Sequence, residues 1–146
     1  MNDKPSAIIM DLDGTLCDGR EYLRLGDHAY HEACTTVAPV DPEMKQVCID
    51  AADAGAMVVI LTGRSVLWQN AGVNWLIGHG VPFHVFESRP RGDYRSNAEF
   101  KTEVARKLER RYRILRAYDD DPRNLRAFEA LGIHAVQVGD FDWRLA

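Results

Sequence analysis

Short apolar runs recur along the chain, and a polar or mixed segment separates each run from the next. A strand that is covered on both faces of a sheet is apolar at nearly every position, so these runs predict buried strands. Five strands are expected, at residues 6–10, 56–61, 83–86, 114–118 and 133–138. Between them, apolar residues at helical spacing predict helices over residues 66–77, 98–110 and 122–131, and one more that begins at Asp41.

Signals at the starts of two expected helices support these assignments. Asp41 is followed by Pro42, and Asp121 is followed by Pro122. A carboxylate that caps the first turn, with proline at the first helical position, is typical of a helix N-terminus. Residues 17–40 show only weak periodicity, and we interpret them as a small insertion that is irregular or partly helical.

Strands that alternate with helices predict an α/β fold. We expect a Rossmann-like parallel sheet of about five strands with helices on both faces and a minimal cap insertion. The sequence has 146 residues, which is enough for one hydrophobic core and too few for two ordinary domains. Residues 1–146 are therefore expected to form a single domain.

The composition narrows the class of protein. Apolar residues make up 46% and charged residues 27% of the chain, as in soluble globular proteins. The sequence contains no apolar run long enough to cross a membrane and no secretory signal pattern at its start, so we expect a cytoplasmic protein. The net charge of −4 argues against nonspecific coating of nucleic acid, although a local basic groove remains compatible with it. The three cysteines fit neither a zinc pattern nor a disulfide framework and are expected to be buried.

Unusual polar residues stand where the expected strands end. Asp11 and Asp13 follow the first strand, Thr62 follows the second, and Asp119 and Asp120 follow the fourth. In open parallel sheets, ligands bind outside the carboxyl ends of the strands. These side chains are therefore expected to form one site.

The chemistry of the carboxylates predicts a metal ion. Two carboxylates that leave a buried strand two residues apart repel each other, and a divalent cation would offset that repulsion. Oxygen ligands without histidine or cysteine favour Mg²⁺ over zinc. The candidate ligands are Asp11, Asp13, Asp119 and Asp120.

The neighbouring groups are those that a phosphate needs. Thr62 supplies a hydroxyl, Gly63 an unobstructed backbone N–H, and Lys101 an ammonium. Asp11 would act as the nucleophile, as carboxylates do in aspartyl-phosphate enzymes. Asp13 would protonate the leaving oxygen and later accept a proton from water. The sequence thus predicts a phosphatase.

Four motifs in this order resemble those of the haloacid dehalogenase superfamily of phosphatases. They are D-L-D-G-T at residues 11–15, L-T-G-R at residues 61–64, Lys101, and the pair Asp119 and Asp120 with Asn124. The resemblance implies that Asp11 is the nucleophile, that Asp13 is the acid and base and binds the metal through its backbone carbonyl, and that Thr62 and Lys101 hold the phosphate. It also implies that Asp119 and Asp120 complete the magnesium site.

Within that superfamily, the chain looks like the 3′-phosphatase domain of phage polynucleotide kinase/phosphatase. The matching stretches are residues 19–20, 80–82, 89–95 and 137–141. The likeness implies that Arg20 and Arg64 contact substrate, and Arg95 belongs to an arginine cluster suited to a nucleic-acid backbone. Asn97 departs from the pattern, because the family carries an acidic residue there.

Two features bear on substrate and partners. No G-x-x-x-x-G-K-[ST] motif occurs, so the kinase half is absent from this sequence and a separate kinase or ligase is an expected partner. The insertion at residues 17–40 is too short for a lid domain, and an open site admits the end of a polymer. We expect removal of 3′-phosphates, or 2′- or cyclic phosphates, from polynucleotide ends. The alternative is a small-molecule phosphatase such as a nucleotide 5′-phosphatase.

Overall fold

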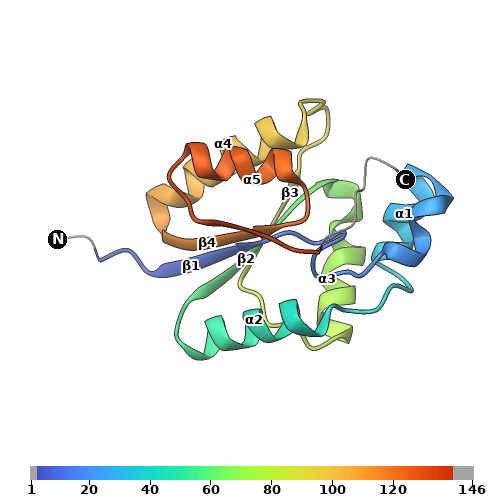
Figure 1. Cartoon of the computed structure of the whole chain (residues 1–146), viewed down its shortest axis with the longest axis horizontal. Helices are drawn as coiled ribbons and strands as arrows, with labels where there is room; N and C mark the ends of the chain where they lie inside the picture. Colours follow the sequence, from blue (N-terminus) through green and yellow to red (C-terminus); the bar gives the residue numbers. More distant parts are fainter. Residues whose placement is uncertain (1–2, 140–146) are drawn as a thin grey trace.

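Five parallel strands form one sheet in the computed structural model, which describes residues 3–139. The strand order is β3-β2-β1-β4-β5, so β1 lies at the centre (Figure 1). The strands are β1 (Ser6–Met10), β2 (Met57–Ser65), β3 (Val85–Arg89), β4 (Arg113–Asp119) and β5 (Ala135–Gln137). This architecture confirms the predicted fold class. Residues 140–141, part of the likeness to the phage domain, lie outside the described residues.

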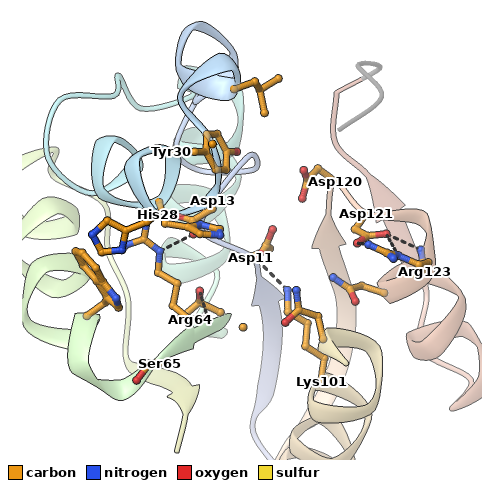
Figure 2. A pocket seen from close by; sticks show the side chains of 18 residues that line it. Asp11, Asp13, His28, Tyr30, Arg64, Ser65, Lys101, Asp120, Asp121 and Arg123 are labelled. Carbon is orange, nitrogen blue, oxygen red and sulfur yellow. Dashed lines mark hydrogen bonds and ion pairs between the residues drawn. The ribbon is translucent and has the colours of Figure 1, made fainter. Parts of the chain in front are cut away.

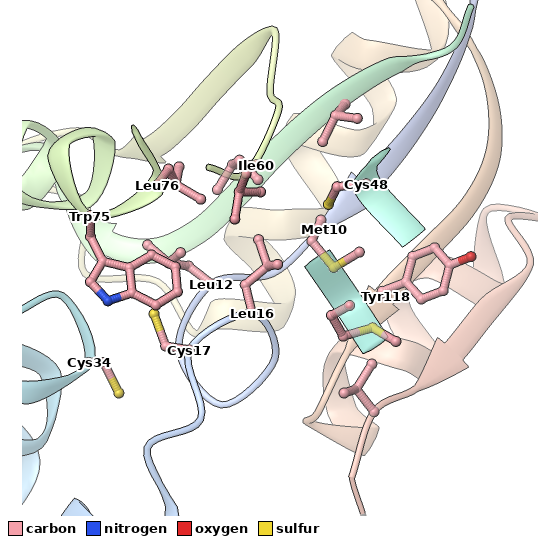
Figure 3. Packing of buried hydrophobic residues seen from close by; sticks show 14 of the residues in the cluster. Met10, Leu12, Leu16, Cys17, Cys34, Cys48, Ile60, Trp75, Leu76 and Tyr118 are labelled. Carbon is pink, nitrogen blue, oxygen red and sulfur yellow. The ribbon is translucent and has the colours of Figure 1, made fainter. Parts of the chain in front are cut away.

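Helices cover both faces of the sheet. In Figure 1, α4 (Asn97–Arg111) and α5 (Pro122–Ala130) lie above it, and α2 (Pro42–Asp53) and α3 (Gln69–Gly78) lie below it. Successive residues of β1 point to opposite faces: Ile8 packs in the cluster that includes Trp75, and Ile9 packs in the cluster that includes Phe100. Figure 3 shows part of the first cluster. Two apolar layers therefore fix the central strand from which the site extends.

The predicted helix starts are confirmed. The Asp41 side chain accepts hydrogen bonds from the backbone N–H groups of Glu43 and Met44, both at 3.0 Å. The Asp121 side chain caps α5 by accepting from the N–H of Arg123 at 2.9 Å. The helix expected from residue 66 begins instead as the 3₁₀ turn η2 (Val66–Trp68), which runs directly into α3.

The insertion after β1 is partly helical, as predicted. It contains the 3₁₀ helix η1 (Arg20–Leu25) and α1 (Asp27–Cys34). In Figure 1, α1 lies beyond the carboxyl ends of the strands. Hydrogen bonds hold its far end in place: Arg64 Nη1 donates to Thr35 Oγ1 at 2.8 Å, and Trp75 Nε1 donates to the carbonyl of Ala38 at 3.1 Å.

Three strands differ from their predicted bounds by two residues or more at one end at least. β2 continues four residues beyond Leu61, β3 begins and ends later than expected, and β5 is shorter. β2 and β3 extend because Ser65 pairs with Arg89 across an irregularity in the register. These residues are polar and border the site, so the apolar pattern did not reveal them as strand.

None of the helices between residues 3 and 139 combines the length and apolar character that a membrane crossing requires.

Candidate active site

The turn after β1 carries the first acidic motif. Gly14 has a φ of +80°, a conformation that residues with a side chain rarely adopt. A Cβ atom at this position would lie 2.5 Å from Asp120 Oδ2. Glycine therefore allows the turn to pass close to the end of β4, and Asp11 and Asp120 face the same space.

Three carboxylates meet at the ends of β1 and β4. One oxygen from each of Asp11, Asp119 and Asp120 lies within 4.8 Å of the others. The parallel pairing of β1 with β4, in which Met10 is opposite Tyr118, brings these residues together from positions far apart in the sequence. Asp119 is almost fully enclosed, whereas Asp120 lines a cavity.

Lys101 joins two of these carboxylates, and Figure 2 shows its contact with Asp11. Its Nζ donates to Asp11 Oδ1 at 2.9 Å and to Asp119 Oδ2 at 2.6 Å. Burial alone would lower the pKa of Lys101, but the two carboxylates outweigh it and raise the pKa above its usual value. Lys101 is thus a buried ammonium beside the carboxylate cluster, and not a surface side chain of α4.

The carboxylates carry more negative charge than Lys101 balances. Burial, together with the charge of Asp119, raises the pKa of Asp11 above its ordinary range, although Lys101 acts in the opposite direction. Burial and the charges of Asp11 and Asp119 raise the pKa of Asp120 still further. A divalent cation would relieve both effects, and a set of oxygen donors only is what Mg²⁺ prefers. The residues present therefore fit a magnesium ion.

Asp13 is held by one of its two oxygens. Its Oδ2 lies 2.6 Å from Arg64 Nε and 2.9 Å from His31 Nδ1. Oδ2 accepts hydrogen bonds from both nitrogens, whether or not Oδ1 carries a proton. Its Oδ1 is buried and has no hydrogen-bond partner among the described residues. The Asp13 side chain is not part of the carboxylate cluster, which agrees with a metal contact through its backbone alone.

Thr62 and Gly63 complete the floor of the site at the end of β2. Thr62 lines the cavity, and its Oγ1 accepts from the backbone N–H of Arg64 at 3.2 Å. A Cβ atom at position 63 would lie 2.2 Å from Asn97 Oδ1, so a side chain there would require Asn97 to move. Asn97 also lines the cavity and accepts from Arg89 Nη2 at 2.5 Å. Asn97, which stands where the phage family carries an acidic residue, therefore still lines the site.

The cavity between these groups has a volume of about 540 Å³. Figure 2 shows Asp13, Arg64, His28 and Tyr30 on one side, Asp11 and Lys101 in the middle, and Asp120 on the other side. One side thus comes from the turn after β1, the insertion and the end of β2, and the other from the residues after β4 and the start of α5. A phosphate held by the Lys101 ammonium would lie between them.

A comparison with protein families assigns the chain. Residues 5–143 match the family described as the polynucleotide kinase PNKP phosphatase domain. The chain belongs to this family. It is therefore a phosphatase of the haloacid dehalogenase type, as the four sequence motifs predicted. No protein of curated function matches the sequence.

Solved structures agree with the PNKP-type phosphatase fold. A chain from the Pnkp1/Rnl/Hen1 RNA repair complex matches with a TM-score of 0.82 and 23% identity, over 97% of this chain and 45% of that one. A class C acid phosphatase from Bacillus anthracis, with tungstate bound, matches with a TM-score of 0.68 and 15% identity over 82% and 53% of the two chains. D,D-heptose 1.7-bisphosphate phosphatase from B. bronchiseptica, complexed with magnesium and phosphate, matches with a TM-score of 0.61 and 17% identity, over 90% of this chain and 78% of that one. The phosphatase domain thus spans less than half of the repair-complex chain that it matches.

Two arginines predicted to bind substrate lie outside the cavity of the phosphatase domain. Arg20 donates to both carboxylate oxygens of Asp18, at 2.8 and 2.7 Å, on the surface of the insertion. Arg95 pairs with Asp93 and Glu103. Their roles toward substrate stay predictions. Arg64 does line the cavity, but its Nε and Nη1 are occupied by Asp13 and Thr35.

The structure also adds residues to the phosphatase site. His28, His31 and Tyr30 reach it from the insertion, and Trp68 reaches it from η2. The sequence did not single out the residues of the insertion, because an irregular segment has no periodicity that reveals which way its side chains point. The only sequence signal was the gathering of histidine and tyrosine between residues 28 and 31.

Proposed function

We propose that this domain removes 3′-terminal phosphates from polynucleotide ends through a phosphoaspartate on Asp11, with Mg²⁺ as cofactor. The same proposal includes 2′- and cyclic phosphates. One observation carries it: the Asp11 carboxylate lies between the Lys101 ammonium and the carboxylates of β4, beside the restrained Asp13.

The first step transfers the phosphoryl group to the protein. A carboxylate oxygen of Asp11 forms a bond to phosphorus while the bond from phosphorus to the leaving oxygen breaks. Asp13, protonated at this stage, gives its proton to that leaving oxygen. Lys101 and Thr62 stabilise the charge that gathers on the phosphoryl oxygens. The dephosphorylated 3′-hydroxyl end is the first product.

The second step releases inorganic phosphate. Water attacks phosphorus, Asp13 takes a proton from that water, and the bond between Asp11 and phosphorus breaks. Asp11 returns to its carboxylate form and Asp13 to its protonated form. Oδ2 of Asp13 is occupied by Arg64 and His31 and Oδ1 is enclosed, so both proton transfers require the carboxyl group to turn toward the cavity.

The residues that would hold Mg²⁺ are Asp11 and Asp120 through their side chains, Asp13 through its backbone carbonyl, and Asp119. When bound, the ion supplies positive charge that offsets the carboxylates and favours a negatively charged phosphate. Asp119 also accepts hydrogen bonds from Lys101 and Asn124, so these contacts hold it in place with or without the ion.

The substrate class rests on family and on shape. The chain belongs to the PNKP phosphatase family, and the complex that it resembles most among the structures described above is a named RNA repair assembly. The insertion adds one short helix and one 3₁₀ helix above the site instead of a lid domain, which leaves room for a polymer end. A role in nucleic-acid repair beside a separate kinase or ligase, in the cytoplasm, is part of the proposal.

A substrate panel tests the proposal. Phosphate release is measured with Mg²⁺, with EDTA and with Ca²⁺ on 3′-phosphorylated oligonucleotides, 5′-mononucleotides and sugar phosphates. We expect the oligonucleotide ends to have the highest kcat/KM, EDTA to remove activity, and Asp11→Asn to abolish it with the circular dichroism spectrum unchanged. A strong preference for 5′-mononucleotides would instead support the nucleotide 5′-phosphatase alternative.

A further inference from the structure

The position of Asp13 determines where the leaving group lies. The general acid must reach the oxygen that departs from phosphorus, so the sugar that carries this oxygen lies on the Asp13 side of Asp11. The opposite side is occupied by Asp120 and the start of α5 (Figure 2). In the proposed function the leaving group is the 3′-terminal nucleoside, and its base extends beyond Asp13.

Aromatic side chains line the cavity on that side. Arg64 contacts Asp13 with its Nε, and its guanidinium carbon lies 5.3 Å from the ring centroid of Trp68. The rings of Trp68 and His28 meet edge to face, with centroids 5.5 Å apart. From Asp13 the contacts therefore run through Arg64 to Trp68 and then to His28, and all four residues line the cavity.

Trp68 differs from the nearby tryptophan of α3. Trp75 is 5% exposed, and its indole N–H donates to the carbonyl of Ala38, so it serves the core. Trp68 is half-buried, and its indole N–H has no hydrogen-bond partner among residues 3–139. Aromatic side chains commonly line ligand pockets, so a half-buried ring that lines the cavity is suited to contact a ligand.

One neighbour of Trp68 is itself fixed in place. Arg64 is 7% exposed and fixed by Asp13 and Thr35, so it gives the indole a rigid neighbour. A base that stacks on a ring already held in place loses little side-chain freedom from the protein on binding. Every nucleobase presents a flat π face, so such a platform tolerates any sequence at the substrate end.

We infer that Trp68, with His28 beside it, forms a stacking platform for the base of the 3′-terminal nucleoside. This inference rests on the proposed function and adds a subsite to it. The platform recognises that the leaving group is a nucleoside, and Asp11 and Lys101 recognise its phosphate.

The test compares two substrates that differ only in the terminal base. One is a 3′-phosphorylated oligonucleotide, and the other is the same molecule with a terminal sugar that lacks its base. We expect the unaltered protein to favour the first in kcat/KM by about tenfold, since one stacked base contributes about that much. Trp68→Ala is expected to remove most of this preference by lowering activity on the base-bearing substrate only. Trp68→Phe keeps an aromatic face and is expected to keep most of it.

Tyr94→Ala serves as the matched control, because Tyr94 is 94% exposed and lies outside the cavity. It is expected to leave both rates unchanged. Equal activity of the unaltered protein on the two substrates, or an equal loss on both in Trp68→Ala, would overturn the platform and leave the proposed function intact. Absence of phosphate release from both substrates would overturn the proposed function and the platform with it.

Discussion

At the scale of single residues, the proposed general acid, Asp13, is closely restrained by its neighbours. Arg64 and His31 both bind its Oδ2, and its Oδ1 is buried without a partner among the described residues. Arg64 is buried, whereas the His31 side chain is 43% exposed. His31 is therefore the weaker of the two supports and the one whose loss the fold tolerates.

His31→Ala is expected to lower kcat by about threefold to tenfold, the effect of losing one ordinary hydrogen bond of about 0.5–1.5 kcal/mol. KM should change little, because His31 acts through Asp13. The loss should be smaller for an aryl phosphate, whose leaving oxygen needs no protonation. Steady-state kinetics on both esters checks this, with the exposed His134 changed to alanine as control. An equal loss on both esters would argue against a role through Asp13.

Lys101→Met is expected to lower the free energy of unfolding by about 3 kcal/mol or more, since Asp11 and Asp119 then lack their buried partner. The pKa of Asp11 is already raised by burial, and removal of the ammonium raises it further. A carboxyl whose folded pKa is raised destabilises the fold above that pKa, so the loss should shrink as pH falls from 8 toward 5. Urea unfolding in metal-free buffer at both pH values measures this.

Lys107→Met is the matched control on the same helix. Lys107 is exposed and pairs with Glu103 at 3.0 Å, and such surface pairs contribute less than about 1 kcal/mol. We expect it to change neither stability nor phosphatase activity appreciably. A similar destabilisation by both substitutions would show that burial of the Lys101 pair is not the cause.

At the scale of elements, helix starts were the most predictable features. Asp41 and Asp121 cap helices as expected, because capping is a local interaction that the neighbouring sequence specifies. The end of β2 was not predictable, because its last four residues are polar or glycine and do not continue the apolar run of a buried strand. The inward-facing residues of α1 depend on contacts with Asp13 and Arg64, which lie elsewhere in the sequence.

Asp41→Ala is expected to lower the free energy of unfolding by about 1 kcal/mol, the typical value of a lost cap. This corresponds to a fall in Tm of about 3 °C. Asp50→Ala on the exposed side of α2 is the control and should have a smaller effect. Both variants should retain full phosphatase activity, because α2 lies outside the cavity. Calorimetry and a phosphate-release assay check the two expectations.

At the scale of the whole molecule, the order of motifs along the chain predicted both the sheet and the carboxylate cluster. Each motif follows a strand, and the parallel arrangement brings strand ends together. The burial of Lys101 and the positions of Arg20 and Arg95 relative to the cavity were beyond sequence reasoning. They depend on how side chains pack between elements, and a charged residue on a helix carries no local sign of burial.

The three cysteines give a test of the packed interior. Cys17, Cys34 and Cys48 are free and buried (Figure 3). Burial raises the pKa of Cys48 and, aided by the charge of Asp13, that of Cys34 to about 12, and it also raises the pKa of Cys17. Since the thiolate is the reactive form, iodoacetamide at pH 8 is expected to leave all three unmodified in the folded protein and to modify all three in urea. Mass spectrometry counts the adducts, and rapid labelling of Cys48 without urea would contradict this packing.

The two sides of the cavity have different origins, and this has a consequence for how such a protein changes. The groups proposed to act on phosphorus lie on the central strands and α4, where substitution disturbs the core. On the leaving-group side, Asp13 and Arg64 come from the turn after β1 and from β2, and the other residues come from a short surface insertion and one 3₁₀ turn. Exchange of residues 17–40 for another segment would therefore change which ester the site accepts, and it would keep the chemical step only if the new segment supplied the contacts that His31 and Thr35 make with Asp13 and Arg64.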